Sequence, residues 1–245
     1  MRFCLTFFLL FSITLFAQNF FQKSYDLNFT DQVLAVEVLA NGHILMAGST
    51  LPSGNVNNTI CLIRTNAAGD VLWTKTILTG TNAVPADMVK TQDGNLLLVY
   101  NNYGANAGLT TTGWAKITPD GDVLWAKKSI NNAVLTKITP VAAGGYLLCG
   151  ENITGGTART GMVLRLDESG ASLWSTVFGE NGSSVVRDCW EDALGFIYCC
   201  GSTSELGADQ NGFWAKLGGD GTLLGPVVRL GSDQEDAMVR IAPIG

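Results

Sequence analysis

The side chains that most often carry catalysis or bind metals are sparse in this sequence. His43 is the only histidine, so a site built from paired histidines is excluded. The segments Asp120-Gly121-Asp122 and Asp220-Gly221 look like fragments of calcium-binding loops, but the full alternation of oxygen ligands ending in a glutamate is missing. We therefore expect no metal, no bound cofactor and no catalytic residue.

Aromatic and polar side chains beside the longer connections are better candidates for ligand binding. Trp114 and Trp214 stand at matching positions next to long polar segments, and an indole face can stack on a sugar ring. Packing in the core is the simpler explanation for both tryptophans. The remaining candidates carry hydroxyl, amide or charged groups that can orient a ligand. The predicted binding residues are Tyr103, Trp114, Arg159, Asp209, Gln210 and Trp214.

Five cysteines follow the N-terminal apolar segment, so at least one of them must stay unpaired within the chain. Cys189 and Cys199 are nearly symmetric about a turn near Leu194, and cross-strand neighbours about 4.5–5.5 Å apart at Cα can form a disulfide. We favour buried free thiols, because Cys200 replaces the small Ala47 of the first repeat. A Cys189–Cys199 disulfide stays the alternative.

The elements that position these side chains recur along the chain. A glycine-to-tryptophan segment occurs at 69–73, 121–125 and 170–174, with a decayed copy at 221–225, and its glycines step by 52, 49 and 51 residues. A second series of glycines opens four apolar runs and steps by 52, 51 and 50 residues; these are Gly42, Gly94, Gly145 and Gly195. Two independent markers with one period predict a tandem repeat.

Each repeat also carries one cation five residues before its turn glycine. The four are Arg64, Lys116, Arg165 and Lys216. We expect them to be solvated or to extend their stems along apolar surface. A ring of cations that binds an anionic ligand is the alternative.

Each unit divides into four short strands, A to D, which in the first unit lie near 33–39, 43–47, 59–65 and 71–77. Glycines close the A–B and C–D turns, where a positive φ is needed. Strand B is apolar on both faces, as an inner strand is, and strand D alternates, as an outer strand does. The B–C connections are long and polar, near 49–58, 101–112, 151–160 and 202–211, and fall on one end of the array, which we call the B–C face.

This pattern predicts an all-β fold, a β-propeller-like array of four-stranded antiparallel blades of about 50 residues each. The repeat domain spans 18–245, with units at about 31–80, 81–132, 133–182 and 183–232 and the start of a fifth at 233–245. Residues 21–25 keep the phase of a lone D strand, and 236–245 that of an A strand. We expect four whole blades, partial blades at both ends and a truncated chain. Solenoid rungs are shorter and sandwich domains longer.

The N-terminus predicts export. Arg2 precedes an apolar stretch from Phe3 to Phe16 that ends at Ala17, which is typical of a signal peptide spanning 1–17. Its removal leaves no segment that could span a membrane, and 14 basic against 21 acidic residues, a net charge of −7. Such a chain repels phosphate backbones, so nucleic acid is not an expected partner. We expect a periplasmic, cell-surface or extracellular location.

The combination of a basic residue, a turn glycine and Leu-Trp resembles two families. Gly69-Asp70-Val71-Leu72-Trp73 and Ala47-Gly48-Ser49-Thr50 are similar to secreted bacterial β-propeller-repeat proteins, a class often exported by a type IX system. That resemblance covers nearly the whole mature chain and implies a scaffold. A weaker resemblance, to quinoprotein-like (PQQ-type) propellers, rests on Trp73, Trp125 and Trp174, but the Thr-Gly-Lys turn of that family is absent.

Together these features predict a non-enzymatic scaffold at the cell surface that engages a protein or a glycan through the B–C face. The alternative is a propeller enzyme, either a quinoprotein-like oxidoreductase or a glycan-cleaving enzyme. A glycosidase needs two carboxyl groups about 5–10 Å apart at the scissile bond. The sequence gives no indication of such a pair.

Overall fold

A computed structural model describes residues 22–26, 30–51, 57–78, 82–103, 110–154, 158–179, 182–205, 209–232 and 235–242, without the side chains of 30, 129–131, 182 and 205. The predicted signal peptide lies outside these residues, as do the tips of the B–C loops at 52–56, 104–109, 155–157 and 206–208. In this part of the chain the secondary structure consists of fifteen β-strands. Nowhere in it is there a helix that could span a membrane.

The strands form four successive antiparallel units in the predicted order. Blade 1 consists of β1 (Thr30–Val38), β2 (Ile44–Leu51), β3 (Thr59–Thr65) and β4 (Val71–Ile77). Blade 2 consists of β5 (Ala83–Lys90), β6 (Leu96–Tyr103), β7 (Thr110–Ile117) and the first half of β8 (Val123–Pro140). Blade 3 continues from the second half of β8 through β9 (Tyr146–Thr154), β10 (Ala158–Leu166) and β11 (Ser172–Phe178). Blade 4 consists of β12 (Gly182–Glu191), β13 (Ile197–Glu205), β14 (Gln210–Leu217) and β15 (Val228–Leu230).

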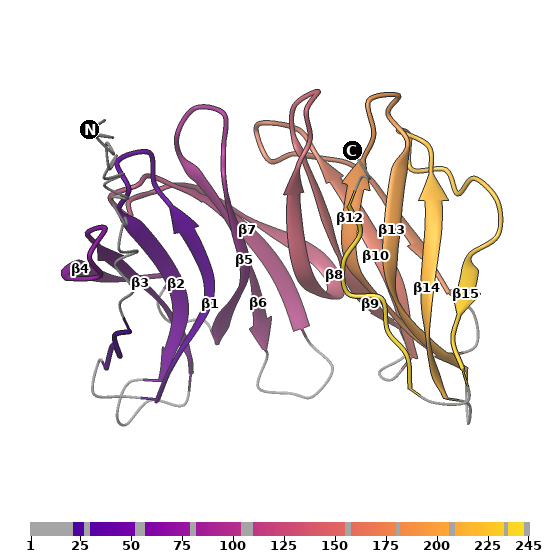
Figure 1. The fold of residues 1–245 in the computed structure, drawn as a ribbon, viewed down its shortest axis with the longest axis horizontal. Coiled ribbons are helices and arrows are strands. Elements are labelled where there is room, and N and C mark those ends of the chain that lie inside the picture. Colours follow the sequence, from indigo (N-terminus) through magenta and orange to yellow (C-terminus); the bar gives the residue numbers. More distant parts are fainter. Residues whose placement is uncertain are drawn as a thin grey trace, which may run out of the picture.

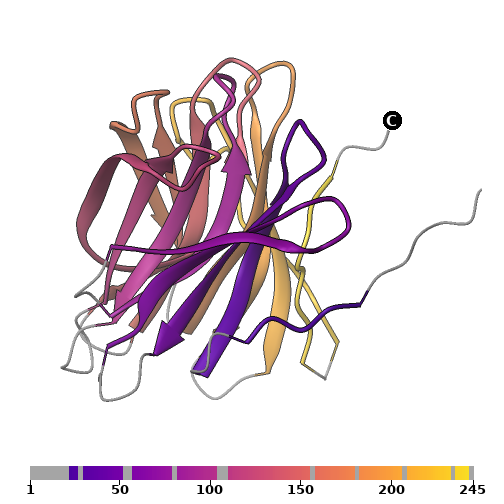
Figure 2. The same cartoon turned by 90° about the vertical axis from the view of Figure 1, so that its left-hand side faces the viewer.

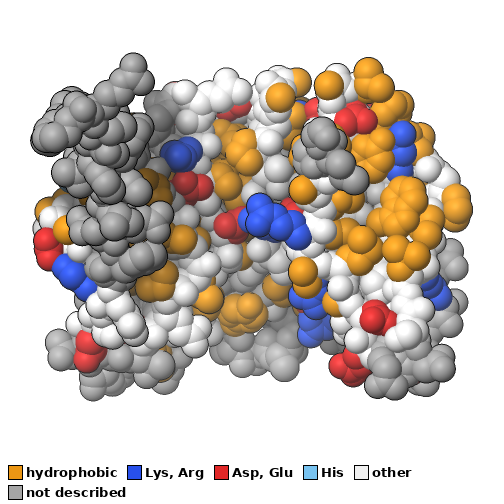
Figure 3. Space-filling model, in the orientation of Figure 1, with side chains coloured by type: hydrophobic (Ala, Val, Ile, Leu, Met, Phe, Trp, Pro, Cys, Tyr) orange, Lys and Arg blue, Asp and Glu red, His pale blue; other side chains and the backbone are white. Residues whose placement is uncertain are grey.

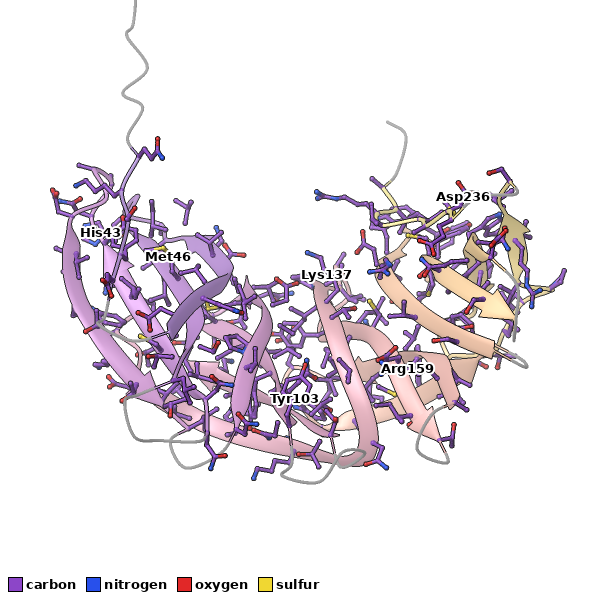
Figure 4. All side chains as sticks on the ribbon, turned by 90° about the horizontal axis from the view of Figure 1, so that it is seen from below. His43, Met46, Tyr103, Lys137, Arg159 and Asp236 are labelled. Atoms are coloured by element: carbon purple, nitrogen blue, oxygen red, sulfur yellow. The ribbon has the colours of Figure 1, made fainter. Side chains whose placement is uncertain are left out.

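The blades stand side by side in an arc, and the chain is a β-propeller-like array (Figure 1). The A strands follow the concave side of the arc and the D strands the convex side (Figure 4). The middle strands are buried along their length, as β2 is, and β4 alternates between exposed and half-buried positions. The predicted inner B strand and outer D strand are thus confirmed.

One connection differs from the predicted pattern. Strand D of blade 2 and strand A of blade 3 form a single 18-residue strand, β8. The sequence between them, Ala126 to Ala133, contains neither glycine nor proline, the two residues that interrupt strands most strongly. Because β12 also makes one parallel bridge to β10, at Arg159 and Ser183, blades 2 to 4 share one hydrogen-bonded network.

Apolar side chains fill the space between successive blades. Leu45 and Leu62 of blade 1 pack in one core with Leu98 and Tyr100 of blade 2. Equivalent cores lie between blades 2 and 3, around Val99, and between blades 3 and 4, around Val163 and Phe213. Alternate residues of one strand thus serve two different cores, which explains why strand B is apolar on both faces.

Each blade is also docked on the next through its outer strand. A Cβ atom added to Gly121, Gly170 or Gly221 would lie 2.9, 2.3 or 2.7 Å from the ring of the preceding blade's tryptophan, Trp73, Trp125 or Trp174. Polar contacts reach the same C–D turns. The Lys127 ammonium donates to the Ser169 carbonyl at 2.7 Å, and the Trp174 indole N–H donates to the Gly219 carbonyl at 3.0 Å. The fixed tryptophans therefore hold neighbouring blades together, as expected.

The two end segments are not strands, which corrects the expectation of a D strand and an A strand there. Both nevertheless make the contacts that a D strand or an A strand makes at the same position in the other blades. At the first blade, which faces the viewer in Figure 2, Lys23 pairs with Asp70 and the Tyr25 hydroxyl donates to the Gly69 carbonyl at 2.9 Å, so this segment contacts a C–D turn as a D strand does. At the other end the Ile241 amide donates to the Asp188 carboxylate at 3.1 Å, as the Ile138 amide does to Asp87.

The repeated cations contact groups of their own blade or of the next blade, and they do not form an anion-binding ring. Arg64 pairs with Asp120 of the next blade, and Lys116 lies 2.7 Å from Asp93. Arg165 donates to the Gly144 carbonyl at 2.8 Å, and Lys216 lies 3.8 Å from the centre of the Phe196 ring. Their half-buried stems agree with the expectation that they extend along apolar surface.

Comparing substitutions at two turn glycines separates the free-energy cost of a strained backbone from the cost of disturbing the contact between blades. Gly170 and Gly94 have nearly the same φ, +73° and +80°, but an added Cβ meets the Trp125 ring only at Gly170 and nothing within 4 Å at Gly94. We predict that Gly94→Ala lowers the free energy of unfolding by about 1 kcal/mol and Gly170→Ala by about 1–3 kcal/mol more, measured by urea denaturation. Equal losses would contradict tryptophan docking.

The cysteines give a second test. All five described cysteines are buried free thiols, with the Cys189 and Cys199 sulfurs 3.3 Å apart. Burial raises the pKa of Cys61 to about 11 and that of Cys200 to about 12. We predict that a thiol reagent at pH 8 labels the native protein slowly and that, in protein lacking residues 1–17 and therefore Cys4, it labels five cysteines after unfolding without reductant. Three labelled thiols, counted by mass spectrometry, would instead show a disulfide.

Candidate functional site

The B–C face carries a group of charged side chains on blades 3 and 4. Glu151 of β9 is buried, with 7% of its surface exposed, and its carboxylate pairs with the Arg159 guanidinium of the neighbouring strand β10. The Arg159 side chain itself is 47% exposed. The pair therefore consists of a buried carboxylate and a guanidinium that solvent can reach.

A second arginine reaches the same place from blade 4. Arg187 is the extra residue of a β-bulge in β12, between Val186 and Asp188. A bulge re-aims its side chain relative to the regular strand. The Arg187 guanidinium donates to the Ser202 hydroxyl at 3.3 Å, and its Nε is buried with no hydrogen-bond partner among the described residues.

Tyr103 approaches from blade 2, at the end of β6. It is 40% exposed, and Figure 4, seen from the B–C face, shows it and Arg159 on neighbouring blades. Partial burial and the nearby Glu151 charge raise the pKa of its phenol, and Arg159 opposes that shift. We call Tyr103, Glu151, Arg159, Arg187 and Ser202 the Glu151 cluster.

Burial and the two arginines shift the pKa of Glu151 in opposite directions. Burial raises the pKa of Glu151, because the charged form loses water, and Arg159 and Arg187 both act in the opposite direction. The charged groups that act on this carboxylate are thus two cations. With both arginines and Glu151 ionised the cluster carries one net positive charge, on a chain whose net charge is −6.

Sequence reasoning found Tyr103 and Arg159 but missed Glu151 and Arg187. Both occupy repeat positions where the other blades have uncharged residues. The strand B position of Glu151 is Ser49, Asn101 and Ser202 elsewhere, and all four are buried. The bulge position of Arg187 is Leu34, Ala86 and Thr136 elsewhere. Alignment of the four repeats position by position would have shown both as departures.

The other predicted binding residues lie elsewhere. Trp114 is 4% exposed, and its indole N–H donates to the Gly170 carbonyl at 2.9 Å, so it belongs to the blade docking and not to a ligand surface. Trp214 is half-buried on the face of blade 4 opposite to Phe213, away from blade 3. Gln210 begins strand β14 and Asp209 precedes it; the Gln210 carbonyl accepts from the Asp236 amide at 2.7 Å.

A cavity away from the Glu151 cluster could also hold a ligand. This cavity of about 580 Å³ lies at the seam of blades 3 and 4, lined by Phe178, Ser184, Phe213, Pro226 and Arg229 among others. It borders residues 224–227, where the outer strand of blade 4 is interrupted before β15. Across the described residues, no group of histidine, cysteine and acidic side chains is arranged to hold a metal ion.

Charged side chains also gather at the middle of the concave side (Figure 3). There Lys90 lies 3.7 Å from Glu37, and Lys137 lies 3.3 Å from Asp87. Each of these ion pairs joins the A strands of two neighbouring blades. They are therefore explained by the assembly of the blades.

Comparison with known proteins finds similarity only to solved structures, and at low sequence identity. No family model and no curated protein matches its sequence. Among solved structures it is similar to a protein of unknown function from Bacteroides caccae, at 14% identity and a TM-score of 0.45, covering 84% of this chain and 71% of that one. It is also similar to an exo-β-1,3-galactanase from Phanerochaete chrysosporium, at 12% identity and a TM-score of 0.47, covering 80% of this chain and 48% of that one.

A third similar structure is an α-L-arabinanase from Penicillium chrysogenum, at 14% identity and a TM-score of 0.45, covering 84% of this chain and 66% of that one. The chain thus spans roughly half to two thirds of the length of these two glycosidases. These similarities are too low to transfer an activity to this chain.

Burial separates Trp114, which is 4% exposed, from Tyr103, which is 40% exposed. We predict that Trp114→Ala lowers the free energy of unfolding by about 3–5 kcal/mol, because it empties a buried site and removes a hydrogen bond to the next blade. Tyr103→Ala should cost less than about 1 kcal/mol. Thermal and urea unfolding of the two variants measure this difference, and a large loss for Tyr103→Ala would mean that this residue supports the fold.

Proposed function

We propose that the protein is an exported, non-catalytic binding module that engages a glycan at the cell surface through the Glu151 cluster. One observation carries this proposal. Tyr103 and Arg159, which come from different blades and which the repeat does not require, both stay exposed beside a buried carboxylate. The repeated glycines and strand D tryptophans, by contrast, are used in blade docking.

The chemistry of the cluster favours a glycan over a protein partner. A sugar ring needs one aromatic face to stack on and a few fixed donors and acceptors around it. Tyr103 can supply the ring face, and the paired Arg159 and Glu151 supply donors and acceptors held in one orientation. A stable protein partner would need about 800 Å² of this face, with an apolar centre.

A glycan-cleaving enzyme is the second candidate, and the raised pKa of Glu151 is the observation that favours it. A buried carboxyl of this kind can act as a general acid. Hydrolysis also requires a second carboxylate at about 5–10 Å in most families. The groups that act on Glu151 are instead Arg159 and Arg187, which suit binding of a ligand better than cleavage of one.

Binding to immobilised glycans tests this proposal. We predict that Tyr103→Ala and Arg159→Ala each weaken binding at least about tenfold, the effect of losing roughly 1.4 kcal/mol of contact energy, while both variants stay folded. Arg240→Ala, which removes an exposed cation from the C-terminal segment, is the matched control and should bind normally. Incubation with the same glycans should release no reducing sugar.

Two results would contradict it. Unchanged binding by both cluster variants would remove the B–C face as the binding surface. Turnover of a glycan that Glu151→Gln abolishes would establish the enzyme instead.

A further inference from the structure

The charges of the Glu151 cluster suggest what kind of sugar it takes. Two guanidinium groups stand against one carboxylate, and that carboxylate is already paired with Arg159. A neutral sugar would leave the excess positive charge uncompensated. An anionic group on the ligand would balance it in a partly buried place, where such pairing is stronger than in water.

Arg187 has capacity for such a group. A guanidinium has five N–H donors in a planar fork. Within the described residues the structure gives Arg187 one hydrogen bond, to Ser202, and leaves its buried Nε without a partner. Arg159 pairs with Glu151 through one nitrogen, and its side chain is 47% exposed, so solvent and a ligand can reach it.

Geometry favours a carboxylate as the anionic group. The two oxygens of a carboxylate accept from a guanidinium in one plane, which adds orientation to charge. Glu151 is buried, and its ion pair restrains the Arg159 guanidinium before any ligand arrives. Tyr103 is exposed on the neighbouring blade, at the same face as Arg159, and its ring is open to a sugar.

We propose that the ligand is an acidic glycan, and that a uronate carboxylate binds at Arg159 and Arg187 while a sugar ring packs on Tyr103. This inference rests on the proposed function and specifies its ligand. It assigns a role to the half-buried Arg187 beyond that of a counter-ion for Glu151.

Oligogalacturonate and its fully methyl-esterified form make a matched pair of probes, because the ester keeps the rings and hydroxyls and removes the charge. Calorimetric titration of the whole chain should show at least about tenfold tighter binding of the acid form. In Arg187→Gln this preference should fall below about threefold, and Arg187→Lys should restore part of it. Tyr103→Ala should weaken both forms alike.

Salt gives a second measurement that does not depend on a variant. Affinity for the acid form should fall between 50 and 500 mM NaCl, because screening acts on the partly exposed Arg159, and affinity for the ester should change little. If Arg187→Gln does not fold, as judged by its thermal unfolding, Arg159→Gln and this salt dependence carry the test.

The outcomes separate this inference from the proposed function. Equal binding of acid and ester that still requires Tyr103 would overturn the uronate inference and leave a glycan-binding module. If neither form binds but neutral glycans bind through Tyr103, the uronate inference is likewise overturned and the glycan-binding module stands. Acid-specific binding that Arg187→Gln leaves unchanged would overturn the assigned role of Arg187.

Discussion

The structure depends on the contact between strand D of one blade and the C–D turn of the next. Each of three tryptophans lies so close to the following turn that only a glycine fits there, and the same glycine supplies the positive φ of the turn. One residue type therefore satisfies local and tertiary requirements together. This explains why the glycine-to-tryptophan segment persists over three repeats, and why the decayed fourth copy, with Gly225 in place of tryptophan, coincides with an interrupted outer strand beside a cavity.

A fold fixed at these positions leaves other positions free to vary. Strand B ends at the B–C face with a buried polar residue in every blade, and in blade 3 that residue is Glu151. The bulge of strand A holds an apolar residue or threonine in three blades and Arg187 in the fourth. The site that we propose arises where two such departures face each other across one blade seam, next to a tyrosine from a third blade. The scaffold supplies rigid placement, and the departures from its repeat supply the chemistry.

The sequence predicted those elements in which each residue type meets one dominant physical requirement. Strands C and D of the first unit were placed at their observed bounds, because turn glycines and alternating apolar residues mark both ends. The continuous strand β8 was missed, since Ser129, Asn131 and Asn132 are residue types that also favour a short loop. The end segments 22–26 and 235–242 keep the phase of strands, but the described residues there form no ladder, which the repeat period alone does not reveal. Trp114 could not be assigned from sequence alone, because an indole beside a loop can face either the ligand or the next blade.

Chemical-shift mapping of the labelled protein during titration with oligogalacturonate tests the central claim most directly. We predict that the largest shifts occur at the backbone amides of Tyr103, Glu151, Arg159 and Arg187, and that saturable shifts are confined to the B–C face of blades 2 to 4. Shifts centred instead on the seam around Phe178 and Phe213, or on the concave side around Lys137, would contradict the claim that the Glu151 cluster is the binding site.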